Sequence, residues 1–257
     1  MRELIDEGQT VYLESGESFE AHFKGTHGTG YTWINSHQYE TNGERNVIFN
    51  DSYIVHDNDL VNEWSREEGG DEYRPRRFGG EISIFQSFDT KKGNDFEEEV
   101  NFVYARPWEL NDGFPTDQDH LTMPYFTSIN VVARKKIEHH FECFDFNLKE
   151  VLPTHVDIRK GDWIRLVLKE NPTTGHMWRT NASADGPLVE LSSIYQLPNT
   201  NLLGASGTRV MILQANQSTY LQIGLASPSQ LSEPGVPANC EECMTIELID
   251  HNDFLTL

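Results

Sequence analysis

Short runs of alternating or β-branched apolar residues recur along the whole chain, and Gly, Pro, Asn or Asp bound most of them. No window of about 11 residues shows a persuasive apolar period of about 3.6 residues, so the pattern predicts strands and not amphipathic helices. The clearest runs are Ile82–Phe88, Val100–Tyr104, Ile129–Val132, Trp163–Leu168, Val210–Leu213 and Tyr220–Leu225. Short strands with this punctuation are typical of β-sandwiches.

The two halves of the chain align with each other, which indicates a diverged tandem repeat. At one constant spacing the alignment pairs Val11 with Val156, Gly16 with Gly161, Thr29 with Thr174, Gly30 with Gly175 and Trp33 with Trp178. At a shorter spacing it pairs Ala105, Pro107 and Leu110 with Ala226, Pro228 and Leu231, so the first copy contains extra loop residues. We expect one β-sandwich in residues 1–136 and another in residues 145–257, with the polar segment Arg134–Phe144 as a connector.

Charge narrows the classes of partner. The chain has 41 acidic and 20 basic residues and a formal net charge of -21, which disfavours nucleic acid and anionic membrane surfaces as partners.

No apolar run approaches the roughly 20 residues of a membrane-spanning helix. The opening segment Met1–Thr10 lacks the basic start and apolar centre of a secretory signal, and the three cysteines are too few for a disulfide scaffold. These features predict a cytoplasmic protein, although a mature secreted or vesicular form fits the same composition.

The segment Asn171–Trp178, with the sequence NPTTGHMW, is the most informative motif. Asn-Pro favours an extended residue before a fixed φ, and Gly175 permits a positive φ, so the two threonines are expected at the tip of a tight loop between strands. A rigid loop of this kind can enter a cleft with little loss of entropy on binding. Taken alone, the motif is better explained as a structural turn.

Two further segments have the composition of binding loops. Leu202–Thr208, with the sequence LLGASGT, precedes the strand-like run at Val210, and in the first copy Arg77–Gly80 precedes Ile82. Their glycines allow close backbone approach to another chain, or simply form a turn. Ala105–Trp108 follows a predicted strand and contains Arg and Trp, which are frequent binding anchors. The alternative is a Trp108 ring folded back onto its own domain, with Arg106 stacked across it.

The second copy has NPTTG-x-x-W, then LLGASGT, then a loop at the position where the first copy has Arg-Pro-Trp. This order resembles the chagasin-type inhibitors of papain-like cysteine peptidases. The resemblance covers both copies. It implies an all-β chain of two tandem immunoglobulin-like β-sandwich domains. It also implies that three loops at one end of a sandwich form a wedge, which plugs the cleft of the peptidase without being cleaved.

The resemblance assigns a role to each loop. The central loop, which is expected over the catalytic residues of the peptidase, comprises Asn171, Pro172, Thr173, Thr174 and Gly175, with Thr29 and Gly30 in the first copy. The loop along the non-primed subsites comprises Leu202, Leu203, Gly204, Ala205, Ser206 and Gly207, with Phe78, Gly79 and Gly80 in the first copy. The third loop, on the primed side, comprises Arg106, Pro107 and Trp108.

Each copy departs from the family pattern in one loop. The second copy has Ser227-Pro228-Ser229 where the family has Arg-Pro-Trp or Arg-Pro-Phe, and so lacks the large apolar anchor. The first copy has Thr26-His27-Gly28 ahead of Thr29 and therefore lacks the stiffening proline. We expect the second copy to be the principal inhibitory domain. Trp33 and Trp178, which close the central motifs, are assigned to the interior of each sandwich.

Other chemistry is sparse. Cys240 and Cys243 have the spacing of metal ligands but no second pair, and His139, His140 and Cys143 lie in the expected connector, so no metal site or cofactor is predicted. The sequence contains no nucleophile elbow, Walker loop or HExxH motif, which argues against an enzyme. Two other classes remain open on the residues alone: a peptidase-binding carrier or adhesion module without inhibition, and an enzyme with a site between the domains.

Overall fold

Alternation of buried and exposed residues defines the strands of the computed structural model. In β2 (Thr10–Glu14) and β16 (Cys243–Asp250) every second side chain is buried, as expected where one face of a strand covers a core. The structure describes residues 3–6, 8–26, 28–39, 44–56, 81–111, 113–115, 125–144, 148–196, 205–230, 235–237 and 242–250. No helix among these residues is long and apolar enough to cross a membrane.

The chain divides into two compact units, Met1–Lys135 and Lys136–Leu257. In unit 1, one sheet has the order β1-β3-β6-β5, with β1 (Glu3–Asp6), β3 (Ser18–Thr26), β6 (Glu81–Thr90) and β5 (Val47–His56). The other sheet has the order β2-β8-β7-β4, with β2, β8 (Tyr125–Arg134), β7 (Phe96–Ala105) and β4 (Thr32–Asn35). The short 3-10 helices η1 (Ser36–Gln38) and η2 (Pro107–Glu109) follow β4 and β7.

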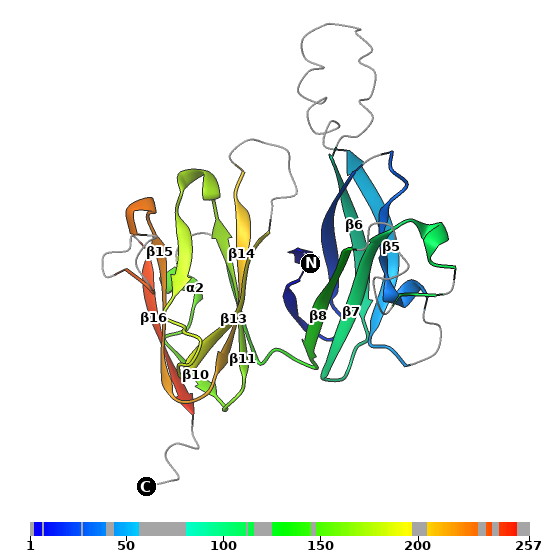
Figure 1. The fold of residues 1–257 in the computed structure, drawn as a ribbon. Helices are drawn as coiled ribbons and strands as arrows, with labels where there is room; N and C mark the ends of the chain where they lie inside the picture. Colours follow the sequence, from blue (N-terminus) through cyan, green and yellow to red (C-terminus); the bar gives the residue numbers. More distant parts are fainter. Residues whose placement is uncertain are drawn as a thin grey trace, which may run out of the picture. The chain divides into compact units, whose positions relative to one another are not determined.

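Unit 2 repeats this arrangement. Its first sheet has the order β13-β14-β11-β9, with β13 (Leu188–Gln196), β14 (Gly207–Ala215), β11 (Trp163–Glu170) and β9 (His139–Cys143). Its second sheet has the order β10-β16-β15-β12, with β10 (His155–Ile158), β16, β15 (Thr219–Ala226) and β12 (Met177–Thr180). One turn of helix, α2 (Leu148–Val151), follows β9, and the 3-10 helices η3 (Pro172–Thr174) and η4 (Pro228–Gln230) follow β11 and β15 (Figure 1).

The two units correspond strand for strand. Each sheet contains one parallel pair, β1 with β3 and β2 with β8 in unit 1, and β9 with β11 and β10 with β16 in unit 2, while all other described pairs are antiparallel. The fold is all-β, with two tandem immunoglobulin-like β-sandwich domains. This confirms the fold class predicted from the sequence.

The interpretation of Arg134–Phe144 as a connector is wrong over His139–Cys143. These residues form β9, which pairs with β11 as β1 pairs with β3 in unit 1. Only Cys143 of this edge strand is fully buried. Because the other residues of the strand remain partly or fully exposed, they can be polar although the strand belongs to a sheet. Cys143 is a free, buried thiol within this strand. Cys243 is disulfide-bonded, which three scattered cysteines did not predict.

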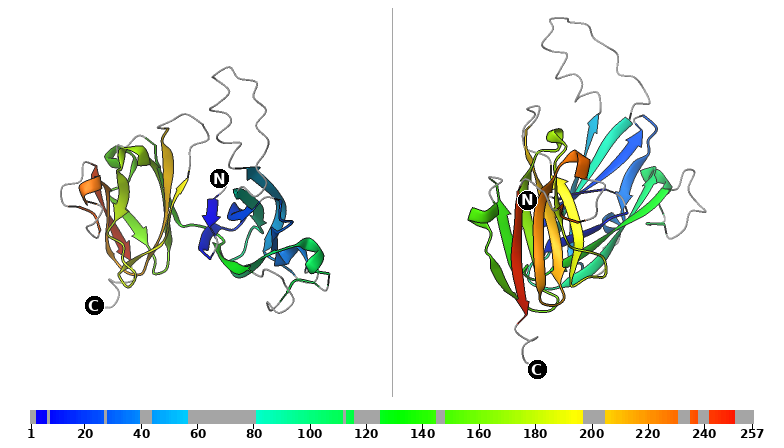
Figure 2. Two further views of the ribbon diagram at one scale, coloured as in Figure 1. Left: turned by 45° about the horizontal axis from the view of Figure 1, so that its top comes forward. Right: turned by 90° about the vertical axis from the view of Figure 1, so that its left-hand side faces the viewer.

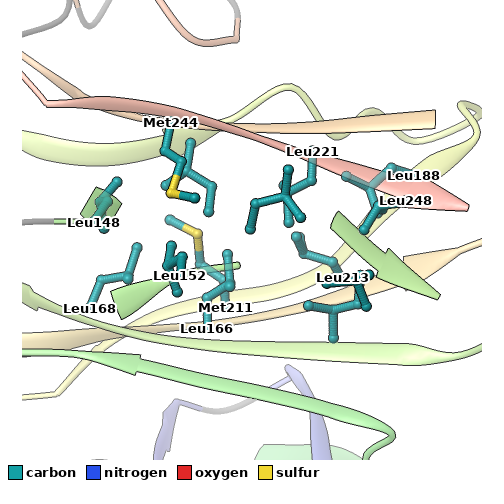
Figure 3. Packing of buried hydrophobic residues seen from close by; sticks show 14 of the residues in the cluster. Leu148, Leu152, Leu166, Leu168, Leu188, Met211, Leu213, Leu221, Met244 and Leu248 are labelled. Carbon is teal, nitrogen blue, oxygen red and sulfur yellow. The ribbon is translucent and has the colours of Figure 1, made fainter. Parts of the chain in front are cut away.

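The core of each unit lies between its two sheets. In unit 2, Leu166, Leu168, Met211 and Leu213 of the first sheet meet Leu221, Met244 and Leu248 of the second (Figure 3). Trp33 and Trp178 are buried, with 5% and 2% exposure, which confirms their assignment to the interior. Their indole N–H groups donate to the carbonyls of Lys24 at 2.9 Å and Lys169 at 2.7 Å, two matching positions of the repeat.

Candidate functional site

The central and third loops of unit 2 lie at the same end of the sandwich. Both Figure 1 and Figure 2 place η3, after β11, and η4, after β15, at this end. Gly175 has a φ of 75°, and a Cβ atom at this position would lie 2.7 Å from Cγ of Pro228. Only glycine therefore combines this backbone conformation with the close approach of the third loop.

Hydrogen bonds within the central loop fix its shape. Asn171 Oδ1 accepts from the backbone N–H of Thr173 at 3.2 Å and from its hydroxyl at 2.7 Å, as in an Asx turn. The Thr174 hydroxyl donates to the carbonyl of Asn171 at 2.8 Å. Both threonines are exposed. The loop therefore presents their methyl groups and hydroxyls on a backbone that needs no partner to order it.

The central loop of unit 1 keeps this turn although it lacks the proline. The hydroxyl of Thr29 donates to the carbonyl of Thr26 at 3.1 Å and accepts from the backbone N–H of Tyr31 at 3.3 Å. In unit 2, Thr174 makes the same pair of bonds, to Asn171 and from the backbone N–H of His176 at 3.4 Å. Gly30 has a φ of 79°, close to that of Gly175. The turn therefore depends on the Thr-Gly pair that both copies share.

Trp108 lies against the central loop of unit 1 and remains 60% exposed. A Cβ atom on Gly30 would lie 2.7 Å from Cη2 of the indole, so the ring occupies the space that a side chain would fill. The Arg106 guanidinium lies 4.5 Å from the centre of the Tyr31 ring and 5.8 Å from that of Trp108. The ring thus contacts its own domain along one side and presents the rest to solvent.

The third loop of unit 2 is polar. The side-chain oxygen of Gln230 accepts from the backbone N–H of Ser227 at 3.0 Å and from its hydroxyl at 2.9 Å. The hydroxyls of Ser227 and Ser229 are 3.1 Å apart. Pro228, and not an aromatic ring, covers Gly175. The two units therefore offer different chemistry beside the same turn.

The glycine-rich loop is described in part. Leu202, Leu203 and Gly204, and likewise Phe78, Gly79 and Gly80, lie outside the described residues. Ala205 and Ser206 are partly buried, and Gly207 begins β14 opposite Glu170, the last residue before the central loop. A Cβ atom on Gly207 would collide with the carbonyl oxygen of Gln196. In unit 1, Glu81 pairs with Thr26, which brings the chain that follows Gly80 beside the central loop.

One charged pair at this end was not predicted. Glu170 is fully buried and forms an ion pair with Arg209 of β14. In the sequence, Glu170 follows Lys169 at the end of a strand and resembles a solvated residue. Only the pairing of β11 with β14 brings Arg209 close to it.

The opposite end of unit 2 holds a cavity of about 560 Å³. Its lining is mainly acidic and consists of Glu138, His139, Asp157, Ile158, Arg159, Asp162 and Asp250. Asp162 Oδ2 accepts from the backbone N–H of Arg159 at 2.8 Å and lies 3.3 Å from His139 Nε2. Across the described part of the chain, no group of His, Cys, Asp or Glu side chains could hold a metal ion.

Comparison with known proteins bears on unit 2, where the loops are best formed. Residues 157–235 match the chagasin family of peptidase inhibitors, family I42. This chagasin-family segment contains the central loop, the glycine-rich loop and the third loop of unit 2, and it covers less than half of the 257 residues. The match confirms the resemblance that the motifs indicated. The chagasin family is one of inhibitors and not of enzymes, so the match supports peptidase inhibition as the general function.

Solved structures give more distant similarities. The cysteine protease inhibitor EhICP2 from Entamoeba histolytica is 16% identical, with 44% of this chain and 95% of that chain covered and a TM-score of 0.33. Amebosin is 14% identical, with 52% and 99% covered and a TM-score of 0.30. Cadherin-like domains 1 to 4 of zebrafish RET are 6% identical, with 96% and 50% covered and a TM-score of 0.27. No curated protein sequence matches the chain.

Proposed function

We propose that the protein is a reversible, non-covalent inhibitor of papain-like cysteine peptidases, and that loops at one end of each sandwich occlude the active-site cleft. The observation that carries the proposal is the central loop of unit 2. It lies within the chagasin-family segment and presents two exposed threonines on a turn that its own hydrogen bonds and Pro228 hold in place. A loop ordered before binding loses little conformational entropy in the complex.

The two units are proposed to bind as independent wedges. Unit 2 supplies the better formed central loop, and its third loop contributes polar groups from Ser227 and Gln230. Unit 1 keeps the Thr-Gly turn and adds the exposed ring of Trp108 as an apolar anchor. We therefore assign the principal inhibitory activity to unit 2 and a second, weaker site to unit 1.

The test is inhibition of papain by the full chain, followed with a fluorogenic peptide substrate. Replacing Thr173 and Thr174 by arginine should weaken inhibition through unit 2 by about a hundredfold or more, about 2.8 kcal/mol, because two bulky cations would enter a filled interface. Gln217→Arg, in the exposed turn between β14 and β15 at the other end, is the matched control and should inhibit as the parent does. A folded double variant that inhibits as tightly as the parent would refute the proposed role of this loop.

A further inference from the structure

The ion pair of Glu170 and Arg209 lies directly beneath the candidate binding loops of unit 2. Glu170 is the last residue of β11, its side chain is 0% exposed, and Asn171 follows it. Arg209 reaches it with two donors, Nη2 to Oε1 at 2.5 Å and Nε to Oε2 at 3.2 Å. The backbone N–H of Trp178, in β12, donates to Oε2 at 3.0 Å. One carboxylate thus connects both strands that flank the central loop with β14.

The same cluster extends to the strands that flank the glycine-rich loop. The Arg209 guanidinium lies 5.8 Å from the centre of the Tyr195 ring, near the end of β13. The hydroxyl of Tyr195 accepts from the backbone N–H of Gly207, the first residue of β14, at 3.0 Å. Glu170 and Gly207 are themselves opposite each other in the sheet. The four strand ends from which the two loops emerge therefore share one polar network.

Stability alone is a weak reason for such a pair. Taking two charges out of water is costly, and an apolar pair of similar volume is often as stable or more stable at a buried site. Unit 1 provides that apolar solution. There Gly25 lies opposite Ile82 as Glu170 lies opposite Gly207, and Ile84 lies opposite Phe23 as Arg209 lies opposite Leu168.

The close neighbours of Gly25 in unit 1 are Ile82, Ile84 and the hydroxyl of Tyr104, which accepts from the backbone N–H of Thr26 at 2.9 Å. Ile84 is fully buried, and a Cβ atom on Gly25 would lie 3.0 Å from its Cδ1. The fold therefore closes without an ion pair. The contact between Gly25 and Ile84 has no counterpart to the two-point fork of Arg209, and the Tyr104 hydroxyl binds a single backbone group.

We infer that Glu170 and Arg209 are positioning residues, which fix the central loop of unit 2 relative to its glycine-rich loop for binding to the peptidase. This inference rests on the proposed function. A bidentate arginine–carboxylate contact sets both distance and angle between β11 and β14. The hydrogen bond from the backbone N–H of Trp178 to the same carboxylate positions β12, the second strand that flanks the central loop. Neither side chain needs to touch the peptidase.

The decisive variant of the full chain gives unit 2 the residues that unit 1 has at the matching positions, Glu170→Gly with Arg209→Ile. We call it the transplanted variant. We expect it to melt within about 5 °C of the parent, because buried ion pairs can be exchanged for apolar packing at little cost. Its inhibition of papain should nevertheless be at least tenfold weaker, which corresponds to about 1.4 kcal/mol. The loss should appear mainly as faster dissociation, because the wedge still forms but fits less well.

Conservative and control variants separate positioning from stability. Arg209→Lys keeps the charge and loses the fork, so it should inhibit less well than the parent but better than the transplanted variant. His139→Gln removes a partly buried contact with Asp162 at the opposite end of unit 2 and should leave inhibition within twofold of the parent. Amide hydrogen exchange, which does not depend on inhibition, should be faster in residues 171–178 of the transplanted variant.

Two results would overturn the inference. One is a folded transplanted variant that inhibits within twofold of the parent and shows unchanged amide exchange. The other is failure of the transplanted variant to fold, which would assign the ion pair to stability. If the parent itself does not inhibit papain, the proposed function fails instead, and amide exchange still shows whether the ion pair orders the loop.

Discussion

Trp108 provides a test of unit 1 as a second binding site. Its ring is 60% exposed while it rests on Gly30, so most of its surface is available to a partner. Taking about 250 Å² for a tryptophan, about 150 Å² could be buried on binding. At about 25 cal/mol per Å² this area corresponds to about 3.7 kcal/mol.

The ordering cost reduces this value only a little. An immobilised side chain loses about 0.5 to 1.5 kcal/mol, and contacts with Gly30 and Arg106 restrict this ring before binding. A net contribution of about 2 to 3 kcal/mol remains, so Trp108→Ala should weaken binding by unit 1 roughly 30- to 150-fold.

Calorimetric titration against papain would measure this in the full chain. In a background with Thr173→Arg and Thr174→Arg, the remaining binding is assigned to unit 1, and Trp108→Ala should abolish it within the range of the instrument. In the otherwise unchanged chain, Trp108→Ala should lower the number of peptidases bound and leave the affinity of unit 2 unaltered. Tyr220→Ala removes an aromatic side chain of similar exposure, 56%, away from the loops and serves as the control.

Two outcomes would contradict the reasoning. Unchanged binding by unit 1 would remove Trp108 from the site. A collapse of inhibition by the whole chain would mean that both units hold one peptidase, with Trp108 as the anchor that unit 2 lacks, and would refute independent wedges.

Two further predictions concern unit 2. Gly175→Ala should weaken inhibition and lower stability by more than about 1 to 2 kcal/mol, because the new Cβ meets Pro228 at 2.7 Å in addition to the strain of a positive φ. Gly235→Ala is its control, because Gly235 has a φ of 76° and no atom lies within 4 Å of the added Cβ. If thermal unfolding shows the same loss of stability in both variants, the clash with Pro228 has no role. Desolvation of its carboxyl group raises the pKa of Glu190, although the residue as a whole is exposed and its carboxylate accepts a bond from Thr180. The contribution of Glu190 to the free energy of unfolding is therefore greatest below the ordinary pKa of glutamate and is lost as pH rises through the raised value. Urea unfolding at a series of pH values should show this loss in the parent and not in Glu190→Gln. The same pH dependence in both proteins would contradict the shift.

The sequence predicted strands in which buried apolar residues predominate. Trp163–Leu168 lies within β11, and Tyr220–Leu225 lies within β15. β9 was interpreted as part of a connector, because it lies at the edge of a sheet and four of its five residues are polar or only partly buried. β5 was not among the runs singled out, and a bulge between Phe49 and Asp51 interrupts its alternation.

The candidate site was predictable to the extent that its turns are local. The Thr-Gly pairs of both central loops, together with Asn171, specify their turns through bonds to near neighbours. The contact of Trp108 with Gly30, and that of Arg209 with Glu170, depend on strand register between distant segments. No local pattern carries that information, so these contacts needed the structure.

The two glycines beneath the third loops have a consequence for how the duplicated units can diverge. In both copies a ring occupies the space above the glycine, an indole in one and a pyrrolidine in the other, and neither glycine can accept a side chain without losing both its backbone conformation and this contact. Selection can therefore act on the covering residue while the turn stays intact. The surface beside the central loop can therefore differ between the two units, aromatic in one and not in the other, on a turn of the same conformation.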